Sequence, residues 1–61
     1  MEKKTKQLVK GDMVRNLLDG KFYEFDRIER AGAGYTFHIL PANVDGNNGY
    51  CEHSDRFTVQ G

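Results

Sequence analysis

The sequence has few of the residues that cross-link or stiffen a small domain. Its 61 residues include one cysteine, one proline and no tryptophan. A single cysteine, Cys51, cannot form an internal disulfide, which predicts a reducing compartment such as the cytoplasm. A chain of this length buries only about 60% of the surface that its unfolded form exposes. Its stability therefore rests on a small number of well-buried side chains.

Long apolar runs and net charge are also missing. No stretch approaches the roughly 20 apolar residues that a membrane-spanning helix needs, and the polar residues 1–10 do not have the pattern of a signal peptide. The net charge is zero, although residues 1–10 carry +3 and residues 11–61 carry −3. An acidic body disfavours nucleic acid as the ligand, because phosphate contacts need a basic face. We therefore expect a soluble, cytoplasmic protein without a membrane segment.

The aromatic residues, in contrast, are concentrated in one central hairpin. Two strand-like runs, residues 21–30 and 35–41, flank a turn at residues 31–34 and hold five of the seven aromatic side chains. A short hairpin turn usually needs a glycine with a positive φ angle, so we expect one at Gly32 or Gly34. The hairpin should supply most of the apolar surface of the core.

The alternation of apolar and polar residues breaks once in the first run of this hairpin. Tyr23 and Phe25 share one face, but Ile28 falls on the other face unless a β-bulge near Asp26-Arg27 inserts an extra residue. We therefore predict a bulge and a bent strand. With the bulge, the core residues are predicted to be Phe25, Ile28, Phe37, Ile39 and Phe57.

A short strand and a loop are predicted on either side of the hairpin. Val14, Leu17 and Leu18 are the apolar residues of the short strand, and the Asp-Gly pair at residues 19–20 is typical of a tight hairpin turn. Residues 42–49 are rich in Asn, Asp and Gly, which predicts a loop.

The two ends of the chain have different patterns. Residues 1–7 are polar and lysine-rich, which predicts a flexible tail. Residues 50–52 and 57–59 predict two further short strands, separated by one turn of 3₁₀ helix at residues 53–56. The sequence thus predicts a single folded domain at residues 8–61.

This order of elements resembles an SH3-like barrel. The resemblance is carried by Val-Lys-Gly-Asp-Met-Val at residues 9–14 and by Glu-His-Ser-Asp-Arg-Phe-Thr-Val at residues 52–59. The chain is similar to the small SH3-like domains of bacterial and phage proteins over about residues 8–60. The resemblance implies an all-β, five-stranded barrel with one 3₁₀ turn before the last strand. It implies no ligand, because such barrels serve unrelated functions, and the groove of the proline-binding type normally includes a tryptophan.

Residue types that catalyse reactions or hold metals are scarce. Cys51 and His53 alternate along a predicted strand and His38 is the other histidine, but a structural zinc site usually takes four protein ligands. An activated thiol needs a positioned base and an electropositive cleft. We therefore predict no enzyme activity, no metal and no cofactor, and we place Cys51 in the core as a small apolar residue.

The remaining candidate site is the outer side of the central hairpin. Phe22 is predicted to point outward beside Glu24 and Asp26, with Tyr50 near it across the sheet. An aromatic ring among carboxylates suits a protein partner with a basic surface, because the ring serves as anchor and the acids form the rim. We therefore predict a non-enzymatic accessory or regulatory protein that binds another protein through these four residues.

Three alternatives stay open at this point. A nucleic-acid- or ribosome-associated SH3-like module would show a steep dependence of affinity on salt and a face rich in lysine and arginine. Self-association would stabilise so small a domain. An exposed aromatic residue without any function is the plain alternative to the predicted surface.

Overall fold

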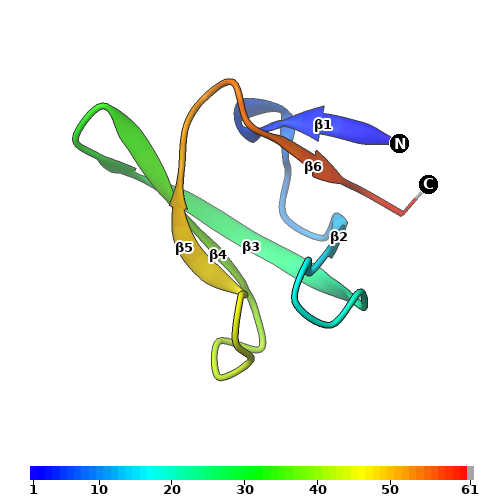
Figure 1. Cartoon of the computed structure of the whole chain (residues 1–61). Helices are drawn as coiled ribbons and strands as arrows, with labels where there is room; N and C mark the ends of the chain where they lie inside the picture. Colours follow the sequence, from blue (N-terminus) through cyan, green and yellow to red (C-terminus); the bar gives the residue numbers. More distant parts are fainter. Residues whose placement is uncertain (61) are drawn as a thin grey trace.

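The computed structural model describes residues 1–60, and in these residues six strands form two antiparallel sheets (Figure 1). The larger sheet curls into a half-barrel and has the strand order β2-β3-β4-β5, while β1 pairs with β6 in the smaller sheet. A single bridge between Val14 and Val59 joins the two sheets. The strands are β1 (Glu2–Lys4), β2 (Met13–Arg15), β3 (Phe22–Ala31), β4 (Gly34–Leu40), β5 (Asn48–Cys51) and β6 (Arg56–Thr58).

The all-β prediction is confirmed, but the prediction of a closed five-stranded barrel is wrong. β1 is an additional strand, and β5 does not pair with β6 in the described residues. The connection between β5 and β6 explains the gap, because its backbone groups have other partners. The carbonyl of Glu52 accepts hydrogen bonds from the backbone N–H of Asp55 and from the hydroxyl of Thr5, at 3.1 and 2.6 Å.

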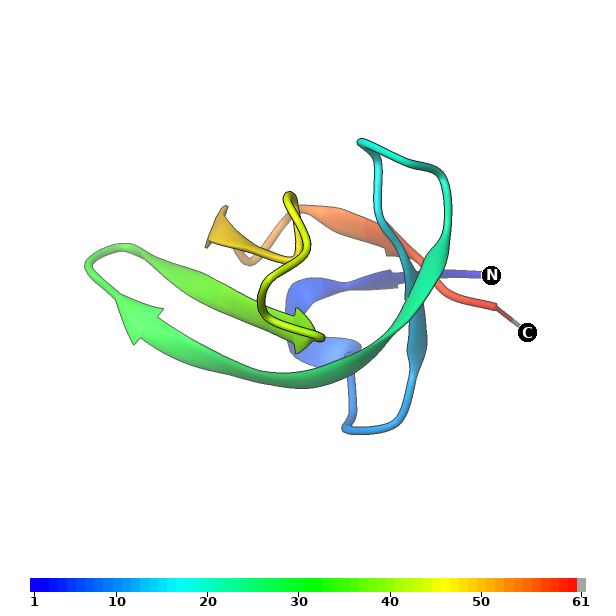
Figure 2. The ribbon, with the colours of Figure 1, turned by 90° about the horizontal axis from the view of Figure 1, so that it is seen from below.

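The predicted β-bulge in the central hairpin is confirmed. Pairing of β3 with β4 shifts between Phe25 and Arg27, so that Asp26 is the extra residue. Beyond the bulge Ile28 lies opposite Phe37, and both pack against the core. Figure 2 shows β3 as one long, bent strand that runs along both halves of the molecule.

The core contains all five of the predicted residues, together with residues that the sequence did not single out. Phe25 and Ile39 are buried, while Ile28, Phe37 and Phe57 are partly buried against them. The rings of Phe37 and Phe57 meet edge to face with centroids 5.5 Å apart, a favoured geometry for aromatic pairs. The additional buried apolar residues of this cluster are Leu8, Val14 and Val59.

Residues 1–7 differ from the predicted tail. They form β1 and a short 3₁₀ helix, η1 (Thr5–Gln7), and Thr5 is completely buried. Its backbone N–H donates to the carbonyl of Asp55 at 3.1 Å, so Thr5 fastens this segment to the start of β6. Lys3 pairs with Asp12 at 2.9 Å. The lysine-rich composition gave no sign of this ordered segment, because its contact with the core depends on one residue, the buried Thr5.

Two further local predictions need correction. Leu17 and Leu18 lie in a turn after β2 and not in the strand, because the side chain of Asn16 accepts the N–H of Leu18 and bends the chain. Residues 53–54 form a single hydrogen-bonded turn and not a 3₁₀ helix. The carboxylate of Asp55 accepts the N–H of Glu52 at 2.9 Å and closes that turn.

The glycines of the central turn have two different roles. Gly32 has a φ angle of 59°, which confirms the predicted positive φ. Gly34 leaves room for β5: a β-carbon there would collide with the ring of Tyr50 and lie 2.6 Å from the carbonyl oxygen of Cys51. Within residues 1–60, no helix has the length and apolar character needed to cross a membrane.

Candidate functional site

The outer surface predicted from the sequence is divided in the structure. Tyr50 on β5 lies opposite Thr36 on β4, which lies opposite Glu29 on β3. Phe22 is at the other end of β3, seven residues before Glu29, which corresponds to roughly 20 Å along the strand. The expectation that Tyr50 lies near Phe22 is therefore wrong.

The acidic neighbours of Phe22 also have different surroundings. Glu24 is exposed between Met13 and Leu40, whereas Asp26 is occupied by ion pairs. Phe22 itself is only half-exposed, opposite Arg15. Among residues 1–60, Phe22 is therefore not an exposed ring surrounded by free carboxylates, and binding of a partner by these residues stays a prediction.

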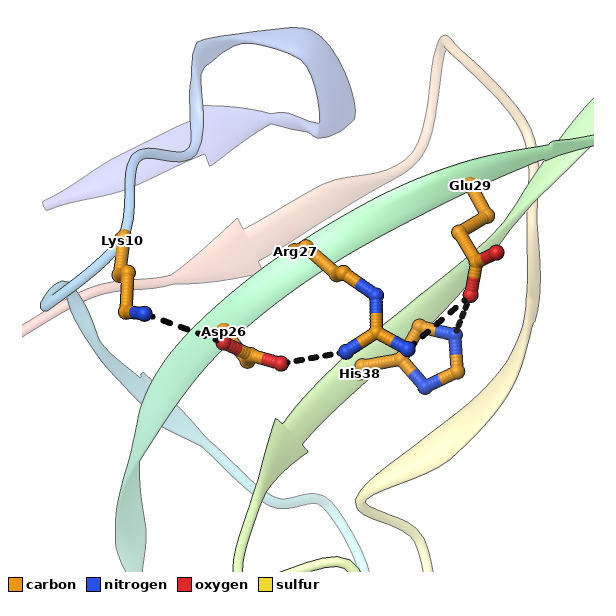
Figure 3. A network of polar contacts seen from close by, with 5 residues as sticks. All are labelled: Lys10, Asp26, Arg27, Glu29 and His38. Carbon is orange, nitrogen blue, oxygen red and sulfur yellow. Dashed lines mark hydrogen bonds and ion pairs between the residues drawn. The ribbon is translucent and has the colours of Figure 1, made fainter.

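A network of ion pairs covers the bulge on this face (Figure 3). Asp26 contacts Arg27 at 2.6 Å and Lys10 at 3.7 Å, and Glu29 contacts Arg27 at 3.3 Å and His38 at 2.7 Å. The contact to His38 is close but poorly aligned for a hydrogen bond. Exposed pairs of this kind contribute about 0–1 kcal/mol each. The network fits a role in holding the bulge, and its carboxylates already have cationic neighbours.

Cys51 is buried, as predicted. Burial raises the pKa of Cys51 above its ordinary value, and the negative charge of Asp55 adds to this effect, while the nearby Thr5 hydroxyl opposes it. A thiol that stays protonated reacts slowly. Among residues 1–60 no three His, Cys, Asp or Glu side chains are grouped so that they could hold a metal ion.

A groove opens where the barrel is not closed, between β5, β6 and the loop from β2 to β3. Its volume is about 530 Å³, within the roughly 300–1,000 Å³ typical of ligand pockets. The half-buried rings of Phe37 and Phe57 line its inner part. Leu17, Leu18 and Tyr50 line its outer part and are 87%, 73% and 59% exposed.

The loop that carries the two leucines is fixed from below by buried amides. Asn16 is 2% exposed, and its amide donates to the side chain of Asn47 at 2.9 Å and to the carbonyl of Asp45 at 2.8 Å. Asn47 is fully buried and donates to the carbonyl of Pro41 at 2.9 Å. This pair ties the β2–β3 loop to the β4–β5 loop. The leucines are therefore exposed on an anchored loop.

Two strand edges border the groove. Among residues 1–60, β5 is the last strand of its sheet, while β6 pairs with β1 on one side and meets β2 on the other side at the bridge between Val14 and Val59. An edge strand directs alternate N–H and C=O groups away from its sheet. The groove is thus lined by apolar side chains and by backbone groups that are able to pair with another strand.

The rim of the groove carries positive charge. Arg15 and Arg56 both line it and are exposed, and neither has an acidic partner within 4.0 Å among residues 1–60. The remaining charged residue of the lining is Asp55, one oxygen of which accepts the N–H of Glu52. Ligand carboxylates would therefore meet arginines whose charge is not yet compensated.

Sequence reasoning missed this groove, although one signal for it was present. Leu17 and Leu18 directly precede an Asp-Gly turn, where a strand interpretation already requires one of the two to point to solvent. Comparison with known proteins gives no help with the site, since the sequence matches no family, no curated protein and no solved structure.

Proposed function

We propose that this chain is a non-enzymatic binding module of the SH3-like type, an accessory or regulatory protein that acts by binding another protein. Its binding site is the groove between β5 and β6. The observation that carries the proposal is the pair of exposed leucines, Leu17 and Leu18, on a loop held by the buried amides of Asn16 and Asn47.

The energetics of a small domain support this choice. Burying a leucine side chain stabilises a protein by about 1.5–3 kcal/mol relative to leaving it exposed. This chain of 61 residues has only a few buried apolar side chains, yet the neighbouring Leu17 and Leu18 are both exposed and add no such stabilisation to the fold. Exposed apolar side chains grouped around a groove are typical of sites that bind another protein.

The charge distribution bears on the kind of partner. A basic partner was predicted because residues 11–61 carry −3, but residues 1–10 belong to the same folded unit and bring the total to zero. The arginine rim of the groove favours a partner with acidic character at this site. A basic partner stays a prediction for the outer face around Glu24.

Capture of a partner by defined variants tests the proposal. The immobilised protein should capture a partner from an extract of its source organism, and Leu17→Ser and Leu18→Ser should each weaken capture. The matched control is Val9→Ser, because Val9 is 58% exposed and lies outside the groove. Equal capture by all three variants would contradict the groove as the binding site.

Nucleic-acid binding is the second candidate, and one observation favours it. The cationic groups of Lys6 and Arg30 lie 5.9 and 5.8 Å from the ring centroid of Tyr35, an arrangement that also suits stacking on a base beside a phosphate. This candidate predicts a shift of DNA or RNA at physiological salt that Lys6→Ala and Arg30→Ala abolish. It also predicts a steep salt dependence.

A further inference from the structure

We propose that the groove binds an extended segment of the partner, which adds as a strand to the edge of β5 and presents a carboxylate to Arg15 and Arg56. This inference rests on the proposed function, and it specifies the chemistry of the ligand. Strand addition supplies affinity through main-chain hydrogen bonds, while pockets for alternate side chains supply specificity.

The edge of β5 lacks the usual protection against such pairing. Natural edge strands carry lysine, proline, a bulge or a covering segment. β5 reads Asn-Gly-Tyr-Cys, without charge or proline, and pairs with β4 in unbroken register. Its four residues span about 13 Å at roughly 3.3 Å per residue. A segment of four to five residues, by that same spacing, would match this edge.

The size of the groove also favours a segment over a globular surface. A standard interface covers about 800 Å² on each partner, which is about a fifth of the 4030 Å² surface of this domain. The groove takes up a much smaller part of that surface, between two strands of four and three residues. A short extended segment fills it without further contacts.

The position of the two arginines follows from the bridge between the sheets. Val14 lies opposite Val59 in an antiparallel bridge, and continuing this register by one residue places Arg15 opposite Thr58. Arg56 is two residues from Thr58 and so lies on the same face of its strand. Diagonal neighbours of this kind are within about 7–8 Å. One carboxylate in the groove is therefore able to reach either guanidinium group.

The ligand chemistry follows from these elements taken together. Alternate side chains of an extended segment point in opposite directions. One apolar side chain would contact Phe37, Phe57 and Leu18 inside the groove, and a Glu or Asp would contact the arginine rim. A second copy of this chain is the competing occupant, because two β5 edges are able to pair with each other.

Fluorescence polarisation with synthetic peptides tests the inference. The probe is a pool of fluorescein-labelled heptapeptides that alternate Thr with Val or Leu and carry one Glu at each possible position. We expect the best binder to lose about tenfold or more in affinity when its Glu becomes Gln, because a hydrogen-bonded charge is removed. Methylation of alternate backbone nitrogens should cause a similar loss, since it blocks strand pairing.

Protein variants complete the test. Arg15→Gln combined with Arg56→Gln should reduce affinity for the Glu peptide about tenfold or more and leave the Gln peptide unchanged. Arg27→Gln is the matched control, because Arg27 lies on the outer face and pairs with Asp26 and Glu29. All of these side chains are exposed, and circular dichroism verifies the fold of each variant.

Three outcomes would overturn the inference. The first is that no peptide of the pool binds at millimolar protein. The second is that the affinity stays the same when the Glu, the backbone N–H groups or the two arginines are changed. The third is a concentration-dependent dimer that Tyr50→Pro disrupts while circular dichroism shows a folded monomer, because the N–H of Tyr50 points away from β4; this would assign the edge to a second copy. If partner capture still depends on Leu17 and Leu18 in these cases, the proposed function stands and only the peptide chemistry is wrong.

Discussion

At the scale of single residues, this fold depends on a few fully buried side chains, some of them polar. Val14, Phe25 and Ile39 provide the apolar centre, and Thr5 and Asn47 are as inaccessible as any of them. A buried polar group is tolerated when it is hydrogen-bonded. Thr5 bonds Glu52 and Asn47 bonds Asn16, so both residues join segments far apart in the sequence. Apolar burial sets the stability, and the polar pairs determine which loops meet.

Phenylalanine truncation should separate the centre of the core from its border. Phe→Ala at a buried site costs about 3–5 kcal/mol, which is most of the stability of a small domain. Phe25→Ala should therefore be largely unfolded at room temperature. Phe37→Ala should retain more structure, since Phe37 is partly buried beside the groove. Urea denaturation followed by circular dichroism compares the two, and a more stable Phe25→Ala would show that the core is wrongly placed.

At the scale of the elements, the connections between strands carry the distinctive features. The bulge at Asp26 bends β3, the turn after Asn16 displays the two leucines, and the turn at Gly32 allows β4 to return along β3. Each of these depends on local backbone geometry or on a side chain that accepts a backbone N–H.

Alanine at the two glycines of the central turn should be unfavourable for different reasons. Gly32→Ala places a side chain at a φ angle of 59° and should cost about 1 kcal/mol. Gly34→Ala directs a β-carbon at the carbonyl of Cys51, so it should disturb the pairing of β4 with β5. Thermal melts should show a larger loss for Gly34→Ala, and the loss should persist with Tyr50→Ala. If Gly34→Ala caused no loss of melting temperature in the Tyr50→Ala protein, the only conflict would be with the tyrosine ring.

Asp12, in the connection between η1 and β2, should make the stability of the fold depend on pH in the acid range. The hydrogen bond from the N–H of Val9, and next the ammonium of Lys3, lower the pKa of Asp12 below its ordinary value of 3.8. The folded state therefore binds this proton less readily than the unfolded state does. The stabilising contribution is fully present above pH 3.8 and is lost as pH falls through the lower pKa of the folded state.

Melting temperatures between pH 2 and pH 6 test this dependence. Wild type should lose stability toward the acid end, and Asp12→Asn should show a smaller loss, because the asparagine has no proton to gain. Asp19 has a lowered pKa through its bonds from Tyr23 and the Lys21 N–H, so it contributes an acid loss that both proteins share. Identical pH profiles for wild type and Asp12→Asn would exclude the proposed role of Asp12.

At the scale of the whole molecule, the chain forms a half-barrel and a separate two-stranded sheet, and the N-terminal segment holds β6 and the connection that precedes it. β1 pairs with β6, and Thr5 holds the connection between β5 and β6. The groove exists because this connection turns away from β5, so that β5 and β6 do not pair with each other.

Removal of residues 1–7 should therefore unfold the protein. The truncated chain loses β1 and the buried Thr5, and it uncovers the β6 edge and the carbonyl of Glu52. Circular dichroism and near-ultraviolet spectra of residues 8–61 measure the effect. A truncated chain that melts like the full protein would support the flexible tail predicted from the sequence.

Much of the fold followed from the sequence, because side-chain alternation records which face of a strand is buried. The broken alternation around Asp26 and Arg27 predicted the bulge, and the aromatic residues predicted the hairpin. The sequence did not predict β1 or the open edge, since both depend on long-range bonds of Thr5 and on chain geometry at residues 52–55. It also placed Tyr50 near Phe22 wrongly, because the distance between them depends on the registers of β3 with β4 and of β4 with β5, which no local pattern encodes.

Hydrogen exchange of the complex with its captured partner tests the central claim most directly. If the groove is the binding site, backbone amides in residues 17–18, 49–51 and 56–58 should exchange more slowly in the complex. Amides around Phe22, Glu24 and Asp26 should then exchange at the same rate with and without the partner. Slower exchange at these outer-face residues, with no change along the groove, would contradict the account.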